Sequence, residues 1–322
     1  MGAMAGNEPL WPAVDPDGAG EPPPPRPRGI GYPVVALVLA AALAVLTGIS
    51  AAGASRTVPG TALPVPTRSA TSTTTPPAPT STTPPIHRIY LLADHPLLAA
   101  GVTLPAVDCA LPRFRRDTAS LRAYYQALVD CMNRAWQPVL AAGMLPYSAP
   151  ELNVDEHPGQ TGCGNPDKDA DLGDFTALYC PADHTLYLPV DRLKDVDRGI
   201  ASSHVAVVAH EYGHHIQELS GLLWAAAEEI GKAGDGSPQA NELIRRSELQ
   251  ANCFAGLFLA AAAGRGAITR NLADQAVAEF RNGALPETHG SATHQAAWAR
   301  KGYQQRTTAA CNTWAAPPSE LS

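Results

Sequence analysis

A run of twenty uncharged and mostly apolar residues, 30–49, constrains the fold of this chain most strongly. Its length matches what a helix needs to cross the hydrocarbon core of a bilayer. Arg26 and Arg28 precede the run directly, and small residues follow it. The positive-inside bias therefore predicts a single-pass transmembrane helix with a cytoplasmic N-terminus and an extracytoplasmic remainder.

A cleaved signal peptide is the alternative for the same stretch. Residues 52–54 read Ala-Gly-Ala, which is similar to a small-residue cleavage site. We favour the membrane helix because the apolar run is long for a signal peptide and follows a long acidic segment. Both interpretations place residues 87–322 outside the cytoplasm.

Composition divides the rest of the chain. Residues 1–29 are rich in Pro, Gly and acidic residues and are expected to form a disordered cytoplasmic segment. Residues 50–86 form a Thr/Ser/Pro-rich linker. The folded domain therefore comes from residues 87–322. The net charge is −7 and no basic run is present, so a nucleic-acid partner is not expected.

Hydrophobic spacing predicts a mostly helical α+β domain. The stretch from Asp117 to Gly143 has apolar residues at helical intervals, with Asp117 or Thr118 as the cap. Two short strands are expected, in ELNV and in TLYLPV, around a loop rich in Gly and Asp. Further helices are expected at about 202–230, 238–264, 270–282 and 292–304.

The stretch AHEYGHHIQ, residues 209–217, predicts a metal site. His210 and His214 are four residues apart, so a helix places both imidazoles on one face, as a zinc ion requires. Glu211 is then placed to act on a water as general base. An amphipathic helix without metal is the alternative, but an apolar stripe is compatible with a metal-binding helix as well. His215 points elsewhere and is expected on the surface or behind the ligands. Gly213 costs the helix about 1 kcal/mol and marks a close approach by another element.

A catalytic zinc needs a third protein ligand. The downstream candidates are Glu228, Glu229, Glu242 and Glu248. Glu228 has a Lys four residues later and Glu242 has an Arg four residues later, which is typical of surface pairs. Glu248 instead enters the apolar stretch SELQANCFAGLFLAAAAG, where a carboxylate needs a partner. A salt bridge to Arg245 is the alternative; the metal is favoured because Asn252, one turn later, can support a ligand.

The motifs HEYGHHIQ and SELQANCFAG together resemble the bacterial family called putative neutral zinc metallopeptidases. The similarity extends to YCPADHTLYLP, THGSA and CNTWAAPPS, and covers about residues 87–322. The resemblance implies a zincin-like fold, in which a small sheet covers the active-site helix and a second helix supplies a glutamate. It implies Zn²⁺ held by His210, His214 and Glu248, with Glu211 as the base.

The sequence departs from the family pattern in two places. Asn252 stands where relatives usually have Asp, and His294 and Gln295 stand where they commonly have Gln and Arg. Asn252 would contact His210 in the family arrangement. His289 is the candidate donor to a developing oxyanion, from its loop and from the family pattern; a structural hydrogen bond is its alternative role.

The reaction implied is hydrolysis of a peptide or protein by a membrane-anchored enzyme. A zinc-stabilised binding domain without activity is one rival, which Asn252 favours and Glu211 opposes. A surface-interaction module with an incidental metal is the other.

Six cysteines without a C-x-x-C pair suit structural disulfides outside the cytoplasm. Six cysteines allow 15 pairings. Pairing neighbours along the chain gives Cys109–Cys131, Cys163–Cys180 and Cys253–Cys311.

Overall fold

The computed structural model describes most of the domain after residue 90. The described ranges are 91–155, 159–165, 176–196, 200–234, 236–283 and 285–322. No helix within these ranges is long and apolar enough to span a membrane. The predicted membrane segment 30–49, the alternative cleavage site and the linker 50–86 lie outside the described residues.

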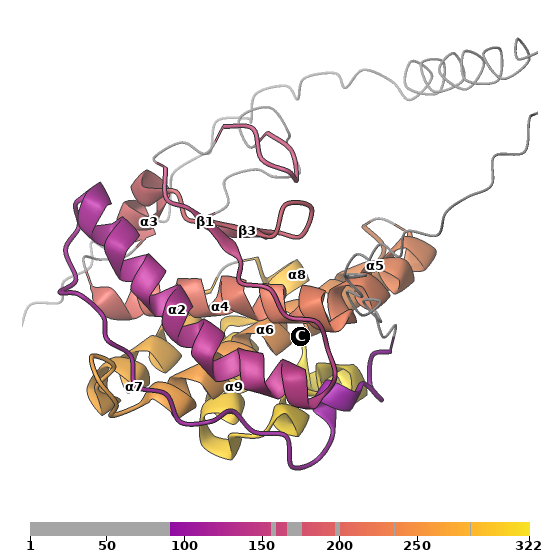
Figure 1. Cartoon of the computed structure of the whole chain (residues 1–322). Helices are drawn as coiled ribbons and strands as arrows, with labels where there is room; N and C mark the ends of the chain where they lie inside the picture. Colours follow the sequence, from indigo (N-terminus) through magenta and orange to yellow (C-terminus); the bar gives the residue numbers. More distant parts are fainter. Residues whose placement is uncertain (1–90, 156–158, 166–175, 197–199, 235, 284) are drawn as a thin grey trace, which may run out of the picture. The chain divides into compact units, whose positions relative to one another are not determined.

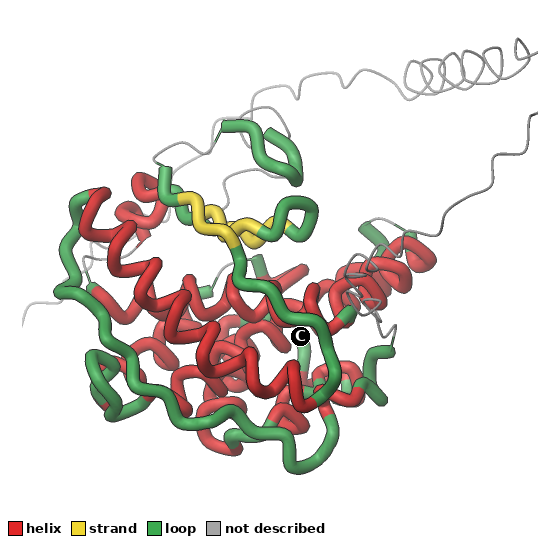
Figure 2. The backbone as a smooth tube through the Cα atoms, viewed as in Figure 1, coloured by secondary structure: helices red, strands yellow, loops and turns green. Residues whose placement is uncertain are grey.

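Helices make up nearly all of the regular structure, with one small sheet beside them (Figures 1 and 2), so the domain is of the expected α+β class. The α-helices are α2 (Thr118–Ala142), α3 (Val190–Val196), α4 (Ala201–Ser220), α5 (Leu222–Ala233), α6 (Pro238–Ala262), α7 (Arg270–Glu279), α8 (Pro286–His289) and α9 (Ala292–Gln305). The 3₁₀ turns are η1 (Pro96–Leu98), η2 (Phe280–Asn282), η3 (Thr308–Cys311), η4 (Thr313–Ala315) and η5 (Pro318–Glu320).

The sheet has three strands in the order β1-β3-β2: β1 (Glu151–Asn153), β2 (Leu178–Cys180) and β3 (Thr185–Tyr187). β1 pairs with β3 in parallel, and β2 pairs with β3 antiparallel. The strands β1 and β3 confirm the expected ELNV and TLYLPV strands. β2 was expected to be loop, because its residues fall within a stretch rich in Gly and Asp. As the edge strand, β2 contacts α4.

The helix expected at about 202–230 is two helices. Gly221 has a φ of +90° and ends α4 in the left-handed region, which glycine adopts without strain. Its N–H donates to the carbonyl of Glu218, 3.0 Å away, and α5 starts immediately afterwards. The four-residue helix α8 was also not expected, because it falls in a loop without a helical period.

Helix α6 lies at the centre of the helical layer, in contact with α4, α5, α8 and α9. It approaches α4 closely at Gly213, where a Cβ atom would lie 2.9 Å from both the Cα and the carbonyl oxygen of Ala251. The close approach expected at Gly213 is therefore present. It fixes the distance between the helix that carries the two histidines and the helix that carries Glu248.

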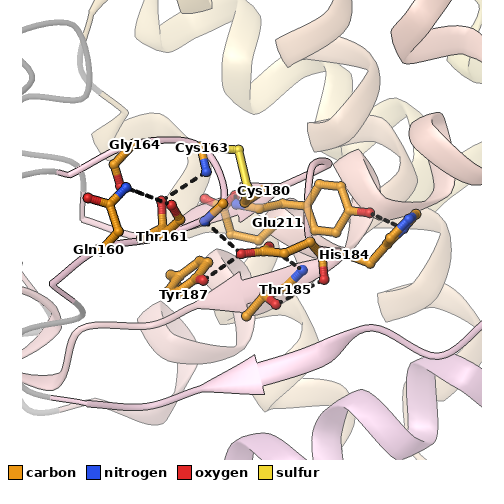
Figure 3. The surroundings of a disulfide bond; sticks show 12 residues. Gln160, Thr161, Cys163, Gly164, Cys180, His184, Thr185, Tyr187 and Glu211 are labelled. Carbon is orange, nitrogen blue, oxygen red and sulfur yellow. Dashed lines mark hydrogen bonds between the residues drawn. A yellow bond between two sulfur atoms is a disulfide. The ribbon is translucent and has the colours of Figure 1, made fainter.

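Three disulfides join the irregular segments to the helices and the sheet, and they are the three pairs expected from the sequence: Cys109–Cys131, Cys163–Cys180 and Cys253–Cys311. The first reaches α2, and the last ties α6 to η3. The second joins a loop to the end of β2, and Figure 3 shows Glu211 beside that strand.

Replacing Gly213 by Ala should destabilise the domain by about 1–3 kcal/mol, because the added methyl group meets helix backbone with no room to move. This outweighs the roughly 1 kcal/mol that Ala gains in helix propensity. Gly231→Ala is the matched control: it lies on α5 and a Cβ there meets nothing within 4 Å. Urea unfolding should show loss for the first variant and none for the second; equal stability of both would contradict the contact.

Candidate metal centre

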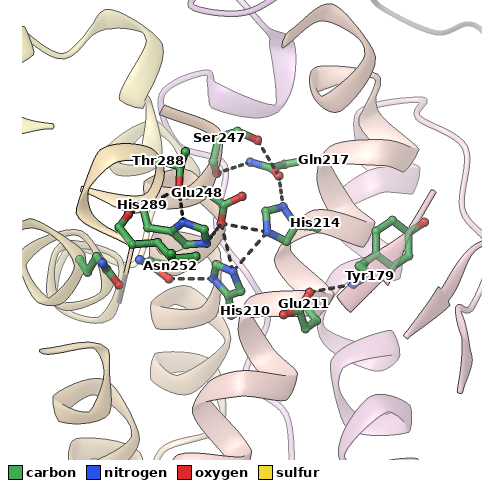
Figure 4. A network of polar contacts seen from close by, with 12 residues as sticks. Tyr179, His210, Glu211, His214, Gln217, Ser247, Glu248, Asn252, Thr288 and His289 are labelled. Carbon is green, nitrogen blue, oxygen red and sulfur yellow. Dashed lines mark hydrogen bonds and ion pairs between the residues drawn. The ribbon is translucent and has the colours of Figure 1, made fainter. Parts of the chain in front are cut away.

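Four side chains from three helices point toward one another (Figure 4). His210 and His214 come from α4, Glu248 from α6 and His289 from α8. The Nε2 atom of each histidine lies 3.3 Å from Oε2 of Glu248. The Nε2 atoms of His210 and His214 lie 3.2 Å apart. The helical spacing of the two histidines explains their part of this cluster, and the approach of α6 at Gly213 brings Glu248 to them.

The second ring nitrogens of His210 and His214 each face an amide oxygen. Nδ1 of His210 lies 2.8 Å from Oδ1 of Asn252, and Nδ1 of His214 lies 2.8 Å from Oε1 of Gln217. A neutral ring that donates from Nδ1 has its lone pair on Nε2, where a metal binds. Such outer partners usually fix the orientation of metal-bound histidines.

The amide of Gln217 can be oriented in only one way. Its Nε2 donates to the carbonyl of Ser247 at 2.8 Å and to Oε1 of Gln250 at 3.0 Å. Both partners are acceptors, so the nitrogen must face them and the oxygen must face His214. His214 therefore donates from Nδ1 and presents a lone pair to the cluster.

The cluster fits a divalent cation. With Nδ1 as the donor, the Nε2 lone pairs of His210 and His214 face each other and the carboxylate at 3.2–3.3 Å. Oε2 of Glu248 is buried and has no hydrogen bond among the described residues. Three electron-rich atoms at this distance repel one another unless a positive charge lies between them. Tetrahedral zinc with bonds of about 2.0–2.1 Å separates its ligand atoms by about 3.3–3.4 Å.

The pKa values of His214 and Glu248 show how the cluster is balanced in charge when no metal is bound. Burial disfavours a charge on His214, but Glu248 outweighs it and raises the pKa of His214 to about 9. Burial likewise works against ionised Glu248, but His214 and the neighbouring histidines hold the pKa of the carboxyl well below its usual range. A proton on His214 therefore takes the place of the cation.

Glu211 follows His210 on α4 but is not part of the ligand cluster. Its buried carboxylate accepts a hydrogen bond through Oε2 from the backbone N–H of Tyr179, at 2.8 Å (Figure 4). Tyr179 is the middle residue of the edge strand β2, so the sheet holds this carboxylate beside the cluster.

The remaining predicted residues fall as follows. His215 is fully buried and turned away from the cluster, with Nδ1 3.0 Å from Oη of Tyr179 and Nε2 2.9 Å from the carbonyl of Ser148. Burial lowers its pKa to about 4, so the ring is neutral. The surface position considered for His215 is wrong, because the sheet covers this face of α4.

The structure does not pair Glu248 with Arg245, which instead donates to the carbonyl of Glu287. Both ion pairs are present, at 2.9 Å from Glu228 to Lys232 and at 2.7 Å from Glu242 to Arg246. The first is exposed as expected, but Arg246 is buried and also donates to the carbonyl of Ala316, at 3.0 Å, so the second is not a surface pair.

Sequence reasoning missed three contributors: Gln217, Tyr179 and Thr288. Gln217 could have been found, because it lies three residues after His214 and so on the same face of the helix. Tyr179 acts through its backbone N–H, which no side-chain pattern reveals. Thr288, whose Oγ1 lies 3.0 Å from Nδ1 of His289, depends on the unexpected helix α8.

These features make a candidate metal site in which an H-E-x-x-H helix and a glutamate from a second helix meet. The family described as "putative neutral zinc metallopeptidase" matches residues 114–314, and the chain belongs to this family.

Two relatives illustrate the range of the similarity. The uncharacterized protein Rv2575 of Mycobacterium tuberculosis is 29% identical over 264 residues, which cover 70% of this chain and 82% of the relative. The uncharacterized protein YpfJ of Escherichia coli is 32% identical over 190 residues, which cover 52% and 62%. No solved structure matches the chain.

Gln217→Leu should weaken zinc binding about 10–100-fold, the usual cost of losing the outer partner of a ligand. Asn252→Leu should have a similar effect through His210. Asn252→Asp should tighten binding, because a charged acceptor is the stronger partner. Gln239→Leu, at an exposed position at the start of α6, is the control. Competition with a chelator measures all four; unchanged affinity for Gln217→Leu would remove it from the site.

Zinc affinity should fall as the pH falls below about 9. Metal-free His214 holds a proton up to its pKa of about 9, and zinc must displace it. For one displaced proton the affinity changes about tenfold per pH unit. Chelator competition across pH 7–9 measures the slope, and calorimetry in two buffers counts the protons released. A flat profile over this range would contradict the assignment.

Proposed function

We propose that this chain is a zinc-dependent peptidase with His210, His214 and Glu248 as its metal ligands. The observation that carries the proposal is the convergence of these three donors at 3.2–3.3 Å, with Glu211 held next to them on the same helix. Membership of the family supports zinc and peptide-bond hydrolysis as the reaction class.

Zinc, when bound, supplies a Lewis acid that activates water and polarises the scissile carbonyl. Glu211 is assigned as the general base that takes the proton of the attacking water and passes it to the leaving amine. Because Tyr179 holds Oε2 of Glu211, we assign proton transfer to Oε1. His289, on α8 at the opposite side of the cluster, is assigned as the donor to the developing oxyanion (Figure 4).

A zincin-like arrangement agrees with the contacts of α4. The edge strand β2 packs against this helix on one side, and α6 supplies a glutamate on the other. The proposal of a zincin-like fold rests on these two features.

We further propose that residues 30–49 anchor the domain in the cell membrane, with the catalytic side extracytoplasmic. The support comes from the uncharged run, from the arginines before it and from three disulfides in the domain, which persist in oxidising compartments. The substrate is then a peptide or protein outside the cytoplasm.

A zinc-stabilised binding domain is the second candidate. Asn252 favours it, because a neutral amide replaces the carboxylate that relatives place behind His210, and holds that ring less strongly. Glu211 would have no role in such a domain, yet it is present and oriented.

Glu211→Gln should keep zinc and lose most peptide hydrolysis, typically a 10²–10⁴-fold effect for a general base. Glutamine can still accept the hydrogen bond from Tyr179, so the fold should persist. Glu229→Gln, an exposed position on α5, is the control and should leave both quantities unchanged. A mixed peptide library assayed with and without chelator, alongside metal analysis, separates the candidates. Zinc without chelator-sensitive cleavage in the wild type would favour the binding domain.

A further inference from the structure

His289 is placed like a metal ligand rather than like a distant donor. Its Nε2 is as far from Oε2 of Glu248, 3.3 Å, as the Nε2 atoms of His210 and His214 are. The ligand atoms of His210, Glu248 and His289 all lie within 4.8 Å of one another. Oε2 of Glu248 accepts no hydrogen bond from His289, so their contact is not a simple histidine–carboxylate hydrogen bond.

The outer partner of His289 differs from those of the other two rings. Amide oxygens face Nδ1 of His210 and of His214, and an amide oxygen can only accept. The hydroxyl of Thr288 faces Nδ1 of His289, and a hydroxyl can accept or donate. His210 and His214 are therefore restricted to the tautomer that offers a lone pair from Nε2. His289 can adopt either tautomer, as a ligand through Nε2 or as an N–H donor from the same atom.

Helix α8 is short and packs mainly against α6. Arg245, one turn before Glu248 on α6, donates to the carbonyl of Glu287. Gln295 donates to the carbonyl of Gly290 at 2.8 Å. Positive-φ residues flank the helix, Leu285 at +58° and Gly290 at +79°. The His289 side chain is 30% exposed, against 13–16% for the other three members of the cluster. His289 is thus the member that can leave with the least disturbance of the core.

We propose that His289 is a fourth protein ligand of the metal in the resting protein and an exchangeable one. The resting centre is then closed by three imidazoles and one carboxylate, whereas catalytic zinc sites keep a position open. An oxygen ligand would displace His289; the neutral ring would then exchange its Nδ1 proton for one on Nε2 through solvent, and would donate from Nε2 to that oxygen while Thr288 donates to Nδ1. This inference rests on the zinc centre of the proposed function and adds a closed state to it.

X-ray absorption spectroscopy of the zinc-loaded full-length protein tests the first part by counting imidazoles per zinc. The wild type should show three, and His289→Ala should show two. Its zinc affinity should fall by at least about 10-fold, no less than loss of an outer partner costs. His294→Ala is the control: its ring belongs to the same segment but hydrogen-bonds Ser291, at 2.9 Å, and three imidazoles should remain.

Acetohydroxamate, a small zinc-binding probe, tests the exchange. It should lower the imidazole count of the wild type from three to two and leave His289→Ala at two. Thr288→Val should weaken the His289 contribution to affinity, and Thr288→Ser should restore it, because only the hydroxyl is required.

The outcomes separate this inference from the proposed function. Two imidazoles in both the wild type and His289→Ala, with equal zinc affinity, would overturn the ligand assignment and leave the peptidase proposal intact. Three imidazoles that persist with acetohydroxamate bound would overturn the exchange. A wild type that binds no zinc would remove the metal centre itself.

Discussion

The contact between α4 and α6 at Gly213 determines the rest of the site. The two helix backbones approach so closely there that no side chain fits between Gly213 and Ala251. Glu248 lies almost one turn before Ala251, so the approach that excludes a side chain also places a carboxylate against the two imidazoles of α4. A glycine that lowers helix propensity is retained at this position because any larger residue would separate the ligands.

A buried polar network then fixes the register of α4 and α6 along their axes. Gln217 from α4 donates to Ser247 and Gln250 of α6, and Gln250 donates to the carbonyl of Cys311 at 3.1 Å. Such a network tolerates no shift of one residue, because each shift would leave buried donors unpaired. Packing brings the helices together, and hydrogen bonding selects the register in which His214 faces Glu248.

The sequence predicted what depends on the helical period and missed what depends on irregular backbone. The pair His210 and His214 follows from a spacing of four residues, and the entry of Glu248 into a buried helix follows from the apolar stretch around it. The family resemblance implied the contact of Asn252 with His210, and the structure brings these side chains together. The edge strand β2 lies within a stretch rich in Gly and Asp, and the helix α8 contains only four residues, too few for a helical period to appear. The break at Gly221 was missed because the apolar pattern continues through it, while the backbone conformation does not.

The two sides of the cluster differ in how firmly they are held, and this follows from their construction. His210, His214 and Glu248 stand on the long helices α4 and α6. The amides that face His210 and His214, those of Asn252 and Gln217, are buried. Glu211 accepts a hydrogen bond from the backbone N–H of Tyr179 in the three-residue strand β2. The disulfide of Cys180 ties this strand to a loop. His289 stands on a four-residue helix between two positive-φ residues. Within the cluster, the proposed ligands His210, His214 and Glu248 therefore stand on long helices, whereas His289, proposed as the exchangeable ligand, stands on a short one.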